Sequence, residues 1–398
     1  MTTIRPTSTV RPAAPATRPA NVAAPSQAAV RVLEADQPNP IVRAIAAVRD
    51  GIRWVMIGPT LPEWKTRQEL ADPDPRWASA TERERAITAV EANRLAEEAA
   101  LARLGDRAEG FRALSMLCLK DPMAREALQK LLLDGRLTAK KDLTGQGDLL
   151  HHLSRLADQP LVSGVDRTEL VTCLIEELEQ PTKTQQEYRG TCVATTATIL
   201  ASRKNPAEVA RLVADLARPE GTAQMANGDT LTRSATWANA DDGNRTPSVR
   251  LLQPALMDYG NFFLRYDNDR DMHTLSQRSV WESLKDGVDR LRRKVALPGG
   301  LEGWGSNRVL EALTGENFTT VHTVTRLNRN SAWNRVEAAL KAGHSVPVGL
   351  MWEGGGHKVL FDRIEGDHVY YTNPWGISER MAIAEAKTNL MDANLPPG

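Results

Sequence analysis

Apolar residues follow helical spacing from residue 40 to about residue 180. Residues that recur three or four positions apart line one face of a helix and predict that this face is buried. Gly, Pro and Asp interrupt the pattern and mark where helices end and begin. The expected helices are 80–104, 107–119, 122–133, 148–157 and 166–179. We therefore expect an all-helical domain at 39–182.

The first helical stretch begins at Pro40 and is amphipathic. Ile41, Ile45 and Val48 lie on one face of it, opposite basic residues that include Arg43. A basic amphipathic helix can lie on a membrane surface or pack onto neighbouring helices. The sequence leaves both roles open.

Beyond residue 182 the pattern changes to helices followed by strands. Cys192–Ser202 reads as a helix, and Pro206 sits where a first-turn proline would begin the next one. Asn227-Gly228 is a hairpin signal. Further helices are expected at 251–259, 279–291 and 331–342, and strands at 318–324, 346–352, 358–364 and 368–372. The predicted class is α+β, with an antiparallel sheet at the C-terminal end of a domain at 183–398.

Residues 1–38 are rich in Pro, Ala, Thr and Ser and lack apolar periodicity. Such a segment buries too little apolar surface to offset the entropy of ordering, so we expect a disordered tail. A plain flexible tail and an export or partner-binding tail, as on bacterial effectors, both fit. The N-terminus lacks the apolar core of a secretory signal peptide. We expect a cytoplasmic protein, or one exported without a classical signal peptide.

The net charge and the number of cysteines exclude some classes of protein. The 50 basic and 50 acidic residues balance, which argues against nucleic acid as a partner. No apolar run is long enough for a transmembrane helix. The cysteines are three, Cys118, Cys173 and Cys192, and an odd, low count argues against a disulfide scaffold. Cys118 and Cys173 sit in apolar helical patterns and read as core residues.

Cys192 has a different setting from the other two thiols. It lies where a loop enters an Ala-rich helix, and Gln186 lies six residues upstream. A thiol at a helix N-terminus feels the positive end of the helix dipole, which favours the thiolate. A nearby amide side chain can donate a hydrogen bond to a developing oxyanion. The segment therefore predicts half of a cysteine nucleophile site.

A histidine and an asparagine near the C-terminus can complete this site. A hairpin with its turn near Gly366 pairs residues whose numbers sum to about 730–733. His357 then faces Asn373, Pro374 or a residue just beyond. A base beside a polar group that orients it is the arrangement that a nucleophile needs.

Other histidines and glycines offer weaker sites. His344 has no neighbouring orienter, His273 and His322 lie in polar segments without pattern, and His368 lies at the turn end of the hairpin. His151-His152 lacks an acidic or Cys partner at ligand spacing, so we expect no metal there. The glycine run 354–356 lacks the Gly-Lys-Ser/Thr that ends a phosphate loop. We expect no cofactor.

Residues 183–398 resemble the papain-like cysteine peptidase superfamily. The order Gln186, Cys192, His357, Asn373 and the intervals of six and sixteen residues match that family's pattern. The Pro-Val strand before Gly-His, and Asn-Pro-Trp-Gly, look most like the bacterial branch that includes double-glycine leader peptidases. The resemblance implies a Cys192 nucleophile paired with His357, Asn373 as the orienter and Gln186 in the oxyanion hole. It implies amide hydrolysis of a protein or peptide through an acyl-thioester.

The sequence also departs from that family. No Trp follows Cys192, and Val193 stands where the leader-peptidase branch usually has Gly or Ala. The same residues could serve a transglutaminase, a deamidase or an acyltransferase. An inert interaction protein is a further alternative. The domain at 39–182 could be regulatory, targeting or partner-binding, and the polar stretch Gln180–Lys183 could be a processing linker.

Overall fold

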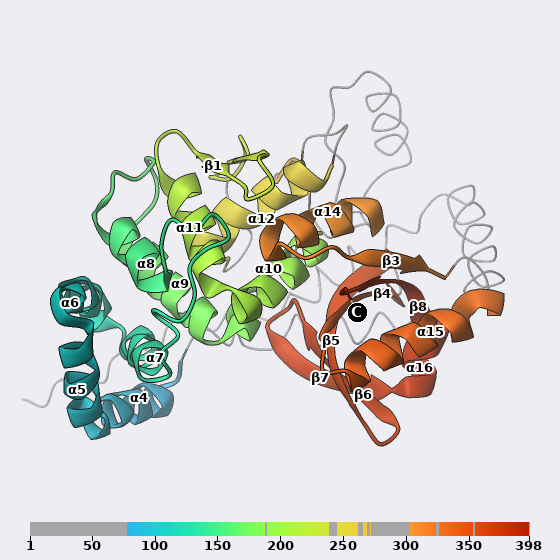
Figure 1. Cartoon of the computed structure of the whole chain (residues 1–398), viewed down its shortest axis with the longest axis horizontal. Helices are drawn as coiled ribbons and strands as arrows, with labels where there is room; N and C mark the ends of the chain where they lie inside the picture. The colour runs from blue at the N-terminus through green and yellow to red at the C-terminus, as the bar shows by residue number, and fades with distance from the viewer. Residues whose placement is uncertain are drawn as a thin grey trace, which may run out of the picture. The chain divides into compact units, whose positions relative to one another are not determined.

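The computed structural model describes residues 78–187, 189–238, 245–261, 266–268, 271, 303–323, 326–352 and 355–397. The expected tail at 1–38 and the expected helices near 40–55 and at 279–291 lie outside these residues. All described residues belong to one compact unit, Ile52–Gly398. This unit combines helices with antiparallel sheets, which confirms the mixed helix-and-sheet class (Figure 1).

The N-terminal part of the unit is helical as expected. Its elements are α4 (Ala80–Ala92), α5 (Arg94–Leu104), η1 (Gly105–Arg107), α6 (Ala108–Leu117), η2 (Cys118–Lys120), α7 (Pro122–Leu133), α8 (Leu149–Asp158), α9 (Arg167–Glu179) and η3 (Pro181–Lys183). Side chains of Asp121, Asp148 and Asp166 accept hydrogen bonds from the first-turn N–H groups of α7, α8 and α9. These caps explain why the Asp residues in the sequence predicted the first residues of these helices closely.

A second group of helices follows in the chain. Its elements are α10 (Cys192–Lys204), α11 (Pro206–Ala217), the hairpin strands β1 (Thr222–Gln224) and β2 (Thr230–Thr232), α12 (Pro247–Gly260) and α14 (Gly303–Thr314). Gly228 has a φ of 87° in the β1–β2 turn, which confirms the hairpin signal. One hydrophobic core joins α7, α8 and α9 to this group. The domain boundary at residue 182 stays a prediction.

The C-terminal part carries a six-stranded antiparallel sheet. Its elements are β3 (Thr319–His322), α15 (Arg326–Lys341), β4 (Val346–Trp352), β5 (Gly355–Glu365), β6 (His368–Asn373), β7 (Ile377–Ala382), α16 (Ile383–Asn389) and β8 (Leu390–Leu395). The strand order is β3-β8-β4-β5-β6-β7. Trp333 of α15 packs edge-on against Phe361 of β5, within a second core.

Strands β7 and β8 were not expected from the sequence. β8 reads Leu-Met-Asp-Ala-Asn-Leu, and its polar residues hide the strand pattern. Asn394 is fully buried, and its amide exchanges hydrogen bonds with the side chains of Ser306 and Asn307. Long-range partners of this kind make a polar residue acceptable in a central strand.

The β5–β6 hairpin positions the C-terminal half of the candidate site. Its turn contains Gly366 with a φ of 60°, and Glu365 pairs with His368. Pairing ends at Leu360 and Thr372, although β5 continues to Gly355 against β4. The beginning of β5 therefore lacks β6 as a neighbour, and α10, which lies beside the sheet in Figure 1, contacts β5 at Lys358 instead. Within the described part of the chain, no helix is both long and apolar enough to cross a membrane.

Candidate active site

Cys192 is the first residue of α10. Thr191 precedes it as the N-cap, and the Thr191 hydroxyl donates to Oε1 of Gln253 in α12 at 2.7 Å. Gln253 in turn donates through Nε2 to the carbonyl of Gln185 at 3.1 Å. One buried amide on α12 therefore holds the residues on both sides of the loop that leads to the thiol.

The thiol lies against the edge of β5. The backbone of Lys358, the residue after His357, lies close enough to the Cys192 sulfur to lower the pKa of the thiol. One turn further along α10, the Thr196 hydroxyl donates to the Lys358 carbonyl at 3.1 Å. The N–H and C=O of one residue in an antiparallel strand point to the same side. Cys192 and Thr196 therefore take the place that a strand would occupy beside Lys358.

Burial controls the protonation of this thiol. Only 7% of Cys192 is exposed. Burial raises the pKa of the Cys192 thiol, while hydrogen bonds with the backbone of Lys358 and Val193 and the charge of Lys358 lower it; the net pKa is above the ordinary value. The sequence predicted that the helix start would favour the thiolate. In the folded chain desolvation outweighs that effect, so the neutral thiol is favoured.

His357 and Asn373 meet as the hairpin register predicted. The His357 Nε2 atom lies 2.9 Å from Asn373 Oδ1, and both side chains are buried. An amide oxygen only accepts hydrogen bonds, so Nε2 carries the hydrogen. In the neutral ring this makes Nδ1 the basic nitrogen. The pair therefore has the arrangement of a general base with its orienter.

Trp375 covers the histidine, a contact that the sequence argument missed. The two rings stack with centroids 4.3 Å apart and planes 15° apart. The turn that presents the indole is closed by a hydrogen bond from Gly376 N to Asn373 O at 3.0 Å, and Gly376 has a φ of 89°. The Asn-Pro-Trp-Gly sequence is the signal that could have found this turn.

Gln186 lies beside the same turn. Its backbone N–H donates to Pro374 O at 2.9 Å, so the loop before Cys192 is joined to the turn after Asn373. The Gln186 side chain is fully buried, and its Nε2 donates to Arg189 O at 2.7 Å. One of the two amide hydrogens is thus used inside the loop. The role of Gln186 as an oxyanion donor stays a prediction.

A buried network of side chains, which the sequence did not reveal, also holds the loop before Cys192. Asp271 Oδ2 accepts from Gly190 N at 2.8 Å and from the Tyr266 hydroxyl at 2.6 Å. The Arg189 guanidinium is 1% exposed and donates to the carbonyls of Asn268 and Asp271. Gly190 and Asp271 lie far apart in the chain, and no local pattern links them.

His152 has an acidic partner, Asp142, ten residues upstream and outside the ligand spacings considered in the sequence. His152 Nε2 lies 2.8 Å from Asp142 Oδ2, and both side chains are fully buried. Arg211 lies within 3.7 Å of Asp142 and also pairs with Glu208 at 2.6 Å. Within the described ranges no group of three or more His, Cys, Asp or Glu residues could hold a metal ion. The cluster is a buried ion network between helices.

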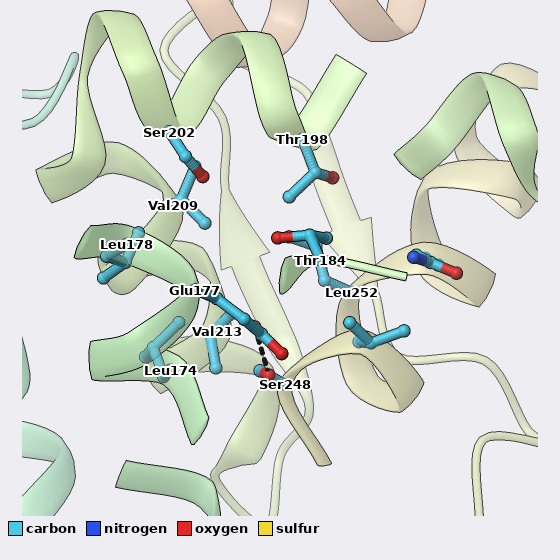
Figure 2. A pocket seen from close by; sticks show the side chains of 12 residues that line it. Leu174, Glu177, Leu178, Thr184, Thr198, Ser202, Val209, Val213, Ser248 and Leu252 are labelled. Atoms are coloured by element: carbon cyan, nitrogen blue, oxygen red, sulfur yellow. Dashed lines mark hydrogen bonds between the residues drawn. The ribbon is translucent and has the colours of Figure 1, made fainter. Parts of the chain in front are cut away.

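A small cavity lies among α9, α10, α11 and α12. Its volume is about 10 Å³, which suits one water molecule. Figure 2 shows Glu177 beside it, hydrogen-bonded to Ser248 at 2.6 Å. Neither Cys192 nor His357 lines the cavity. It is therefore too small to hold a substrate of the candidate site.

Comparison of the chain with protein-family models, with characterised proteins and with solved structures gives no match.

Proposed function

We propose that this chain is a cysteine-dependent amide hydrolase with a papain-like catalytic arrangement. The observation that carries the proposal is the 2.9 Å hydrogen bond between His357 and Asn373, at the end of β5 that packs against the helix of Cys192. A thiol, a base and an orienter of the base in one place are the parts that covalent acyl transfer requires. The proposed substrate is a protein or peptide amide.

The proposed reaction begins with transfer of the Cys192 proton to Nδ1 of His357. The sulfur then attacks the amide carbonyl, and the oxyanion accepts hydrogen bonds from the Cys192 backbone N–H and from Gln186. Imidazolium gives its proton to the departing amine, which leaves a thioester on Cys192. Water, deprotonated by His357, hydrolyses the thioester and restores the thiol.

Asn373 contributes through the charge state of His357 in this scheme. The ring gains a proton when the thiol is deprotonated, and a hydrogen bond from Nε2 to Oδ1 strengthens as the ring becomes positive. Trp375 covers the buried ring and keeps water from competing for that bond. Because the pKa of Cys192 is raised, proton transfer to His357 is an obligatory part of the attack.

The test is labelling by a thiol-directed epoxide, followed by product analysis. We expect the native protein to be labelled at one site, Cys192→Ser to lose labelling, and Cys173→Ser to keep it as a matched control. Incubation with a peptide library then separates cleaved backbones from deamidated side chains and from amine conjugates. Cys192→Ala with native activity on a cleaved peptide would overturn the assignment.

A second candidate function is that of an inert interaction protein. The low exposure of Cys192 and its raised pKa favour this alternative, because both reduce nucleophilicity at neutral pH. The Gln186 amide hydrogen that is used on Arg189 favours it as well. Absence of Cys192 labelling in the folded, reduced protein would select the inert alternative.

A further inference from the structure

A carboxylate on β7 contacts the orienting asparagine. Glu379 Oε2 accepts from Asn373 Nδ2 at 2.8 Å. Strand pairing explains why they meet. Tyr371 of β6 pairs with Glu379, and residues two apart on one strand share a face of the sheet. Asn373 is therefore the diagonal neighbour of Glu379, within reach of a long side chain.

The chemistry of the two partners decides how the amide is turned. A carboxylate accepts hydrogen bonds and cannot donate them, so the NH₂ group of Asn373 must face Glu379. The Asn373 oxygen then faces His357 Nε2 at 2.9 Å. The backbone N–H of Trp375 lies 3.4 Å from the same oxygen and favours the same orientation.

We propose that Glu379 is a positioning residue that fixes the amide of Asn373 and, through it, the nitrogen of His357 that carries the hydrogen. If the amide turned by half a rotation, its NH₂ group would face Nε2. The neutral ring would then carry its hydrogen on Nδ1, the nitrogen that must accept the Cys192 proton. The catalytic consequence rests on the proposed function, whereas the effect on the tautomer does not.

Four variants test this role. Glu379→Gln keeps an acceptor for Asn373 through its amide oxygen, so it should preserve the amide orientation. Glu379→Ala removes the acceptor. Glu379→Lys replaces the acceptor with a donor and favours the turned amide. Ser378→Lys places the same lysine on the neighbouring exposed residue of β7 and serves as the matched control.

The first readout is the tautomer of His357, measured by nitrogen NMR on histidine-labelled protein and assigned with His357→Gln. We expect the Nε2–H form in the native protein, in Glu379→Gln and in Ser378→Lys. We expect the Nδ1–H form to become populated in Glu379→Ala and to dominate in Glu379→Lys. The inference is wrong if Glu379→Ala and Glu379→Lys both keep the native tautomer. Should the lysine variant fail to fold, the alanine and glutamine variants decide.

The second readout is the rate of Cys192 labelling and of any peptide cleavage. We expect Glu379→Gln within about threefold of the native rate, Glu379→Ala slower by about tenfold and Glu379→Lys by about a hundredfold, because the wrong tautomer disables the base. Native rates in both the alanine and lysine variants would contradict the role. If the native protein is never labelled, the proposed function fails, and the NMR result still decides the role of Glu379.

Discussion

The contact between Asn373 and Glu379 predicts that aspartate, a common orienter of histidine, is a poor replacement at position 373. Asn373→Asp would place a second carboxylate where the amide now donates to Glu379 at 2.8 Å. Two negative charges about 4 Å apart repel by about 4 kcal/mol at the effective dielectric constant of a protein surface. Because Glu379 is half-buried, we take about 2–4 kcal/mol as the loss of unfolding free energy near pH 8.

The pH dependence follows from the direction of the shift. Repulsion raises the pKa of the carboxyl pair in the folded variant above its unfolded value of about 4. Below pH about 4 both states are protonated and the penalty is absent. The penalty grows as the pH rises through the window between the unfolded and folded pKa values, and it is complete above the folded pKa.

The assay is a double-mutant cycle of urea unfolding at pH 4 and pH 8. It compares the native protein with Asn373→Asp, Glu379→Gln and the double variant, in which the glutamine amide can donate to the new carboxylate. We expect a coupling free energy of about 2–4 kcal/mol at pH 8 that disappears near pH 4. Additive effects at pH 8 would refute the reasoning, because they would mean that the two side chains do not interact.

Three further predictions concern other parts of the site and the core. Alkylation of Cys192 by iodoacetamide in His357→Gln should have its pH midpoint above the ordinary thiol value of about 8.5, because burial raises the pKa of this thiol; an ordinary or lower midpoint contradicts the buried setting. Asp271→Ala should lower the unfolding free energy by about 2–3 kcal/mol and slow Cys192 labelling, because Gly190 N–H and the Tyr266 hydroxyl lose their buried acceptor; an unchanged urea midpoint would contradict this. Burial raises the pKa of Asp142, but hydrogen bonds from Thr144, His152 and Gly147 outweigh burial and hold that pKa well below its usual range. The stability that Asp142 contributes is therefore present above the pKa of the unfolded state, about 4, and is lost in stronger acid. Asp142→Asn should lower the unfolding free energy by about 3 kcal/mol at neutral pH, measured by chemical unfolding, and should make that free energy less dependent on acid pH. An unchanged unfolding free energy would show that His152 and Arg211 need no partner there.

Short-range sequence signals predicted most of the described helices and the pairing of His357 with Asn373 in the candidate site. Asp121 and Pro122 begin α7 at the expected residue, because an N-cap and a first-turn proline act on their own neighbours. The distance from Gly366 to His357 along one strand, and to Asn373 along the next, was enough to bring those two residues together. Short-range geometry is readable from a single sequence.

Long-range contacts were not readable in the same way. Glu379 reaches Asn373 only because β7 pairs with β6, and β7 was not expected. The loop before Cys192 is held by Asp271 and Gln253 from distant segments. The raised pKa of Cys192 depends on how completely the folded chain covers the thiol, which the helix-start signal alone does not reveal.

The order of strands in the sheet bears on when the candidate site can be assembled during synthesis of the chain. Among the strands of the described residues, β8 is synthesised after the others, yet it lies between β3 and β4, and β4 in turn supports the strand that carries His357. Cys192 is translated much earlier, on a helix that needs that same strand edge as its neighbour. The sheet that supports the strand of His357 is therefore continuous from β3 to β4 only after Leu390–Leu395 has been inserted. On the proposed function, we expect His357 to be held firmly as a base only after that insertion.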